Sequence, residues 1–201
     1  MKISRLAFFF VTFLVAFAAA AALGCTGTSP YMAPTTSSAV EMAPEMATVV
    51  FVRPSQHGGA ARVTLMDGKG RFLGDTMPGT HFAVKMPPGE HLFISWGEIT
   101  SSVKATLAAG KVYFVEAYSP TGPGSPFLAL RAVTLSSSSW AKVDEWVTHT
   151  QGLKPNEEQG QAYLRGAAGG VESAIRKGNT VFAGYDAKEL PEHTIAVEDG
   201  K

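Results

Sequence analysis

Cysteine is almost absent from this sequence, since Cys25 is the only one in 201 residues. A single thiol has no partner within the chain, so the sequence excludes an intramolecular disulfide framework and predicts a domain stabilised by its apolar core. Strong net charge is absent as well, because 17 Lys and Arg residues balance 17 Asp and Glu residues. This balance argues against a nucleic-acid-binding protein and against a polybasic membrane-binding surface.

Recognisable catalytic motifs are also absent. The sequence contains no Gly-x-Ser-x-Gly elbow, no P-loop and no Rossmann glycine pattern. Its five histidines are not spaced like the ligands of a zinc site. We therefore expect a protein that is not an enzyme and that needs neither a metal nor a cofactor.

Only one apolar run is long enough to span a bilayer, Leu6–Leu23, and it follows the basic residues Lys2 and Arg5. Such a run is compatible with a membrane-spanning helix. Two features favour a cleaved signal peptide over residues 1–24: the small residues Ala20–Gly24 at its end, and the lack of a basic stop signal behind it. Loss of Lys2 and Arg5 leaves 15 basic and 17 acidic residues in the mature chain.

The segment Ala22-Leu23-Gly24-Cys25 resembles the lipobox of bacterial lipoproteins. The resemblance implies that the Cys25 thiol receives a diacylglyceryl group and that the chain is cut before it. Leu usually stands three places before the cysteine, where this chain has Ala22, and the alternative is a stray thiol near a signal junction. The resemblance implies a cell-envelope protein anchored by lipid on Cys25. Thr26 in place of Asp favours the outer membrane, with the domain facing the periplasm or the cell surface.

Residues 25–46 are rich in Ser, Thr, Pro, Ala and Met and show little periodicity. This composition predicts a flexible tether between the lipid and the domain. Twenty such residues would span roughly 25 Å on average, which would hold the domain clear of the headgroups.

Residues 47–135 consist of short β-rich runs divided by glycine and proline, which predicts an antiparallel β-sandwich of about seven or eight strands. The Asp67-Gly68-Lys69-Gly70 segment is typical of a hairpin turn. The expected strands are Ala47–Arg53, Ala61–Met66, Arg71–Gly74, His81–Met86, Glu90–Trp96, Val103–Leu107, Lys111–Tyr118 and Phe127–Thr134.

Residues 136–201 predict a helical C-terminal extension, with a first helix over 140–148 whose apolar stripe contains Trp140, Val143 and Val147. A second helix is expected to start near Pro155-Asn156 and to stop at Gly178, with glycines weakening its middle. The extension is either a docking element or a cover for an open sheet edge or face.

A family resemblance covers about 85 residues, from Thr48 to about Val133. It is carried by three segments: Val50-Phe51-Val52-Arg53-Pro54, Pro88-Gly89-Glu90-His91, and Ala109-Gly110-Lys111-Val112-Tyr113-Phe114. These segments resemble the domain of unknown function 2846 family of small bacterial lipoproteins, and the pattern is similar to PEGA-like and transthyretin-like sandwiches. The resemblance implies a β-sandwich and no known activity.

Polar side chains in the predicted strands give few candidate sites. His81 and His91 would form a two-histidine surface site if a hairpin made them neighbours, and the simpler interpretation is two half-exposed strand residues. Paired carboxylates would indicate a glycosidase, but one sequence cannot show that they face each other across a cleft. We expect Glu116 to lie on the solvent face of its strand.

Aromatic residues give the better functional candidates. Trp96 beside a turn and Tyr118 beside a long loop could flank a ligand surface, although most aromatic residues here must form the core. The sequence thus favours a non-enzymatic envelope lipoprotein that binds a partner protein or an envelope polymer. The alternatives are a carbohydrate-binding module that uses Trp96 and Tyr118, and less favourably a hydrolase.

Overall fold

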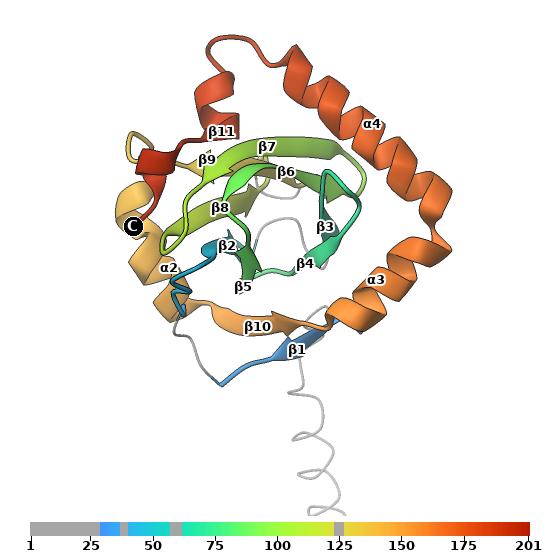
Figure 1. Cartoon of the computed structure of the whole chain (residues 1–201), viewed down its shortest axis with the longest axis horizontal. Helices are drawn as coiled ribbons and strands as arrows, with labels where there is room; N and C mark the ends of the chain where they lie inside the picture. The colour runs from blue at the N-terminus through green and yellow to red at the C-terminus, as the bar shows by residue number, and fades with distance from the viewer. Residues whose placement is uncertain (1–28, 37–39, 57–61, 123–126) are drawn as a thin grey trace, which may run out of the picture.

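A computed structural model describes residues 29–36, 40–56, 62–122 and 127–201 (Figure 1). The predicted signal peptide and Cys25 lie outside these residues. No helix in the described part of the chain combines the length and the apolar character that a membrane span requires.

The described residues form a mainly β structure with two mixed sheets. The six-stranded sheet has the order β1 (Met32–Pro34), β10 (Gln151–Pro155), β5 (Thr80–Met86), β2 (Ala47–Arg53), β8 (Val112–Tyr118), β9 (Ala129–Val133). The five-stranded sheet has the order β11 (Thr194–Ile195), β7 (Thr100–Leu107), β6 (Gly89–Trp96), β3 (Val63–Asp67), β4 (Phe72–Thr76).

The expected β class is confirmed, while the strand count and the pairing differ from the prediction. The described residues contain eleven strands, and three neighbouring pairs are parallel: β10–β5, β2–β8 and β11–β7. The additional strands β1, β10 and β11 come from segments predicted as tether and helical extension. β1 and β11 have three and two residues, too few to display the period-two pattern by which a strand is recognised. β10 has five residues, but Gly152 and Pro155 within it disfavour a strand assignment.

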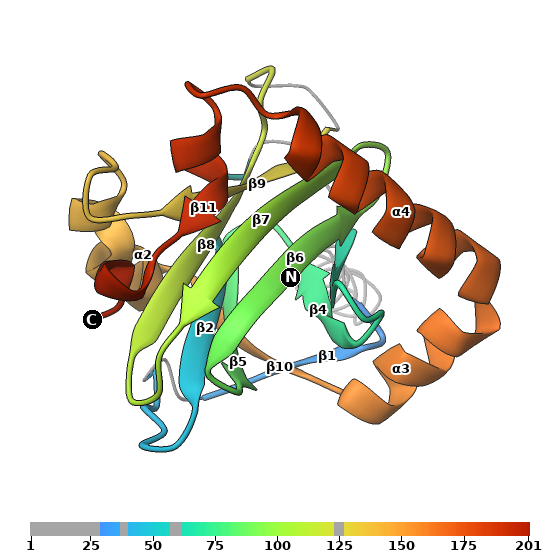
Figure 2. The ribbon, with the colours of Figure 1, turned by 45° about the horizontal axis from the view of Figure 1, so that its top comes forward.

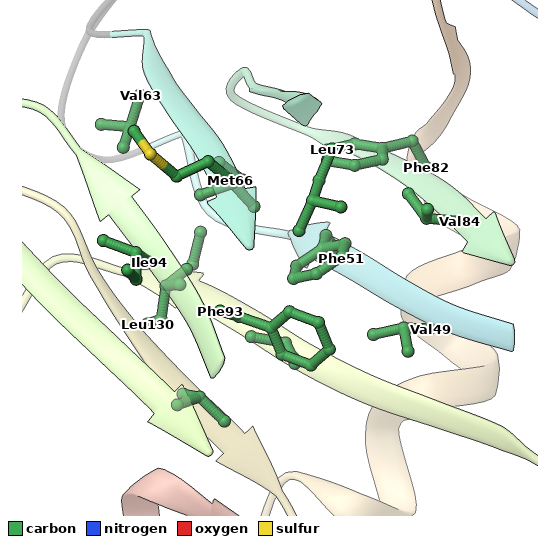
Figure 3. Close-up of a cluster of buried hydrophobic side chains, with 14 of the residues drawn as sticks. Val49, Phe51, Val63, Met66, Leu73, Phe82, Val84, Phe93, Ile94 and Leu130 are labelled. Carbon is green, nitrogen blue, oxygen red and sulfur yellow. The ribbon is translucent and has the colours of Figure 1, made fainter. Parts of the chain in front are cut away.

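The core lies between the two sheets, whose inner faces share one cluster of buried apolar side chains (Figure 3). Phe51 of the central strand β2 stacks on Phe82 at 5.3 Å between ring centroids and meets Phe93 of the other sheet edge-on, also at 5.3 Å. All seven residues of β2 are buried. Its continuous apolar run follows from its position, because both of its faces are covered.

The outer face of β2 and β8 is covered by η1 (Trp140–Lys142) and α2 (Val143–His149). Val143 is buried there, and Trp140, Trp146 and Val147 pack against a second apolar cluster that includes Val50. The predicted helix and its apolar stripe are confirmed, and the stripe covers the sheet.

The second predicted helix is two helices, α3 (Glu157–Gly166) and α4 (Ala168–Gly184), separated at Ala167. Its predicted start is confirmed, since the Asn156 side chain accepts a hydrogen bond from the Gln159 N–H at 3.1 Å. The predicted stop at Gly178 is wrong. A Cβ there would approach Ile94 to 2.9 Å, so this glycine allows α4 to pack closely on β6 and β7, as Figure 2 shows.

Candidate functional site

The two aromatic candidates lie apart in the fold. Trp96 ends β6 of the five-stranded sheet, where it stacks on Tyr163 of α3 at 5.9 Å, and a Cβ on Gly170 of α4 would meet it at 2.9 Å. Tyr118 ends β8 of the six-stranded sheet, with the Arg131 guanidinium 4.5 Å from its ring centroid. Both side chains are half-buried against neighbours. The structure therefore does not bring Trp96 and Tyr118 together into one surface.

Glu116 is a buried acid, and its predicted place on the solvent face is wrong. It is 6 % exposed, and its Oε2 lies 2.8 Å from Arg131 Nε and accepts a hydrogen bond from Ser139 Oγ at 3.3 Å. Burial raises the pKa of Tyr118 beside this pair, while the positive charge of Arg131 opposes the rise. Arg131 pairs directly opposite Glu116 on β9, which explains why an acid is tolerated within an apolar strand.

His81 and His91 do not form the two-histidine site, because β5 and β6 belong to different sheets. His81 is buried, and its Nδ1 lies 2.7 Å from Thr150 Oγ1. Burial lowers the pKa of His81, and the contact with Thr150 partly offsets this. Among the residues that the structure describes, no group of three or more His, Cys, Asp or Glu side chains is arranged to hold a metal ion.

Two other basic side chains are buried, although no local sequence pattern indicates it. Arg53 is 1 % exposed at the end of β2, and burial lowers its pKa to about 10. His193 of η2 (Leu190–His193) stacks on Tyr185 at 3.8 Å, and burial lowers the pKa of its imidazole. Both side chains pack inside the protein, so neither offers a charged group to a ligand at the surface.

A groove of about 470 Å³ lies on the six-stranded sheet, between β5 and β10. This volume is within the usual range for ligand sites. Consecutive residues of both strands line it, together with residues before β2, Arg71 and the start of α3. The lining residues are Thr35, Val40, Glu41, Thr48, Arg71, His81, Phe82, Ala83, Val84, Lys85, Leu153, Lys154, Pro155 and Glu157.

The groove exists because β10 pairs with only the first half of β5. The parallel register joins Thr80–Phe82 to Gln151–Leu153 and stops there, although β5 continues to Met86. Pro155 has no N–H to continue the ladder, and the chain turns into α3 directly after it. On this side, no strand among the described residues pairs with 83–86, whose other side pairs with β2. The groove is thus bordered by an open strand edge.

Charged side chains rim this groove in pairs that remain accessible to water. Lys85 lies 3.8 Å from Glu41, and Arg71 lies 3.3 Å from Glu157. Exposed pairs of this kind contribute little to stability, about 0–1 kcal/mol, so a ligand can replace either partner at low cost. Lys154 is exposed and has no acidic partner within ion-pair distance in the described residues. The rim therefore offers positive charge to a carboxylate.

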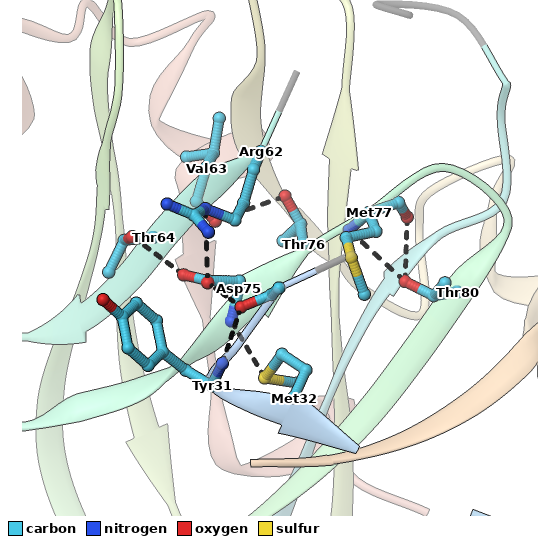
Figure 4. Close-up of polar contacts among 10 residues, drawn as sticks. Tyr31, Met32, Arg62, Val63, Thr64, Asp75, Thr76, Met77 and Thr80 are labelled. Atoms are coloured by element: carbon cyan, nitrogen blue, oxygen red, sulfur yellow. Dashed lines mark hydrogen bonds and ion pairs between the residues drawn. The ribbon is translucent and has the colours of Figure 1, made fainter. Parts of the chain in front are cut away.

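A second polar cluster, which we call the N-terminal seat, consists of Ser29, Tyr31, Met32, Arg62, Thr64 and Asp75 (Figure 4). Asp75 of β4 is wholly buried, and it accepts hydrogen bonds from Ser29 Oγ at 2.5 Å and from Thr64 Oγ1 at 2.8 Å. Arg62 Nε lies 3.5 Å from the same carboxylate. No local sequence pattern indicates this cluster, since Ser29 and Asp75 are 46 residues apart.

Comparison of the chain with known protein families, with curated proteins and with solved structures found no match. The resemblance of residues 48–133 to the domain of unknown function 2846 family stays a prediction.

Proposed function

We propose that this protein is a non-enzymatic lipoprotein of the bacterial cell envelope, anchored by lipid on Cys25 and facing the periplasm or the cell surface. Its domain, in our interpretation a β-sandwich with additional edge strands, binds an extended segment of a partner protein in the groove between β5 and β10. The observation that carries this proposal is the edge of β5 beyond Phe82, which pairs with no strand of the described residues on this side and of which residues 83–85 line the groove.

An extended peptide is the ligand whose shape fits this site. Strand addition supplies main-chain hydrogen bonds from an exposed sheet edge and takes its specificity from pockets for alternate side chains. Four open residues span about 13 Å at the usual strand rise, enough for a short segment. Ala83 is exposed and lines the groove, and its small side chain leaves room for a ligand there. Lys154, Lys85 and Arg71 along the rim favour a segment that carries an acidic side chain.

The test is selection of random linear peptides on the exported Cys25→Ser protein, followed by affinity measurement. We expect selected peptides to contain Asp or Glu and to lose binding when Ala83→Trp fills the groove. The matched control is Ala109→Trp, which places the same side chain in the exposed turn between β7 and β8 and should leave binding intact. Peptides that bind wild type and Ala83→Trp equally well would contradict the proposed groove.

A further inference from the structure

The N-terminal segment is fixed to the domain from Ser29 onward, where the sequence predicted a flexible tether. Ser29 is 5 % exposed and donates to Asp75, while the Tyr31 N–H donates to Ser29 Oγ at 3.1 Å. The Asn156 N–H donates to the Tyr31 carbonyl at 2.8 Å, and β1 then pairs antiparallel with β10. Backbone and side-chain hydrogen bonds thus hold residues 29–31 to the domain, directly before β1 joins the six-stranded sheet.

Apolar and aromatic contacts reinforce the N-terminal seat. Tyr31 stacks on Tyr163 of α3 at 5.0 Å and meets Phe72 of β4 edge-on at 6.0 Å. The Arg62 guanidinium lies 5.6 Å from the Tyr31 ring centroid. Met32 is 8 % exposed and belongs to the main core. Release of the segment would expose the apolar Met32 side chain and leave the buried Asp75 without the Ser29 hydroxyl. Both changes raise the free energy, so the segment is expected to stay bound.

The seat leaves very little chain between the domain and the proposed lipid. Cys25 and Ser29 are four residues apart, and four residues span at most about 14 Å when fully extended. The predicted tether of roughly 25 Å is therefore too long, because it counted residues that fold into the seat and β1.

We propose that the corner of the domain around Ser29 lies against the membrane surface, held within about 14 Å of the acylated Cys25. This inference rests on the proposed lipid anchor. The ligand of this surface is the lipid headgroup layer, and the short tether, rather than basic charge, holds the domain there.

The sheet register shows which end of β6 lies near the N-terminal seat and which end lies far from it. Asp75, Thr64 and Trp96 are aligned across β4, β3 and β6, so the Trp96 end of β6 lies on the side of the seat. Glu98, exposed in the turn after β6, marks this near end. Glu90, exposed at the start of the same strand, lies six residues before Trp96, or about 20 Å away.

The experiment compares a fluorescent label at Glu98→Cys with one at Glu90→Cys in the full lipidated protein. Because Cys25 is the only native cysteine and lipid occupies its sulfur, each new thiol is labelled uniquely. The protein is reconstituted in vesicles of phosphatidylethanolamine and phosphatidylglycerol that carry a short-range quencher on the headgroup. We expect several-fold stronger quenching at position 98 than at position 90.

A spacer variant keeps the test decisive. A long Gly/Ser insertion between Thr28 and Ser29 leaves the seat intact and lengthens the tether, so quenching at position 98 should fall to the level at position 90. Equal quenching at both positions with the native tether, or no effect of the spacer, would overturn the inference. Failure of the lipid anchor itself is recognised separately, because the protein would then lack acyl mass and would not float with the vesicles.

Discussion

The two edges of β10 place polar groups in opposite situations. On the β1 side, the N-terminal seat encloses Asp75, which is 0 % exposed and is bound by hydroxyl groups of the same chain. On the β5 side, the groove is rimmed by pairs such as Lys85 and Glu41, whose side chains are 54 % and 80 % exposed. The seat uses its polar groups to stabilise the fold, whereas the groove leaves them accessible to a ligand.

The largest loss of stability is expected from a variant that disrupts the N-terminal seat. Asp75→Ala leaves the Ser29 and Thr64 hydroxyls without their acceptor and Arg62 without its partner. We expect a loss of about 2–4 kcal/mol in the free energy of unfolding, measured by urea denaturation. Glu41→Ala in the groove is the matched removal of a carboxylate and should change stability far less. Similar losses for both variants would remove the distinction between the two regions.

The second prediction concerns the aromatic part of the seat. Tyr31→Ala removes the contacts of the Tyr31 ring with Tyr163 and Phe72. We expect the free energy of unfolding to fall by about 1–2 kcal/mol, since Tyr31 is only half-buried. Tyr31→Phe keeps the ring and should remain close to wild type in the same denaturation assay. A Tyr31→Ala protein as stable as wild type would show that β1 is loosely held.

The third prediction uses His81 at the inner end of the groove. Burial lowers the folded-state pKa of His81, so the unfolded chain binds a proton more readily than the folded protein. The stabilising contribution is complete above the unfolded pKa of about 6.5 and is lost as the pH falls below it through the folded pKa. His81→Asn should flatten the decline of melting temperature with acidification. If the melting temperature of His81→Asn declines as steeply as that of wild type, other groups, such as the buried His193, cause the decline.

The smallest stability effect is expected in the groove. Lys85→Ala should change the free energy of unfolding by less than about 0.5 kcal/mol, because its pair with Glu41 is largely exposed. The same variant should weaken binding of the selected acidic peptides. Lys104→Ala, which removes another exposed lysine paired with Glu90 on the other sheet, should not. Equal binding by both variants would argue against a role for the rim charge.

Local patterns predicted much of the fold from the sequence. The buried run of β2, the apolar stripe of α2 and the Asn156 cap are visible within a few neighbouring residues. The hairpin turn after β3 is another example, since Asp67 Oδ1 accepts from the N–H groups of Lys69 and Arg71. In each case the signal and the structure lie close together in the chain.

The remaining features depend on distant residues that no local pattern reveals. Glu116 is buried because Arg131 lies opposite it on β9, and Gly178 is required because Ile94 of another element lies against it. The groove depends on where the pairing of β5 and β10 ends. None of these can be inferred without the strand register.

The proposed lipid on Cys25 is tested most directly by intact mass and membrane fractionation of the expressed protein, comparing wild type with Cys25→Ser. We expect wild type to be membrane-bound and to carry added acyl mass, and Cys25→Ser to lack this mass. A wild-type protein that is unmodified and soluble would contradict the anchor and, with it, the membrane-apposed position of the seat.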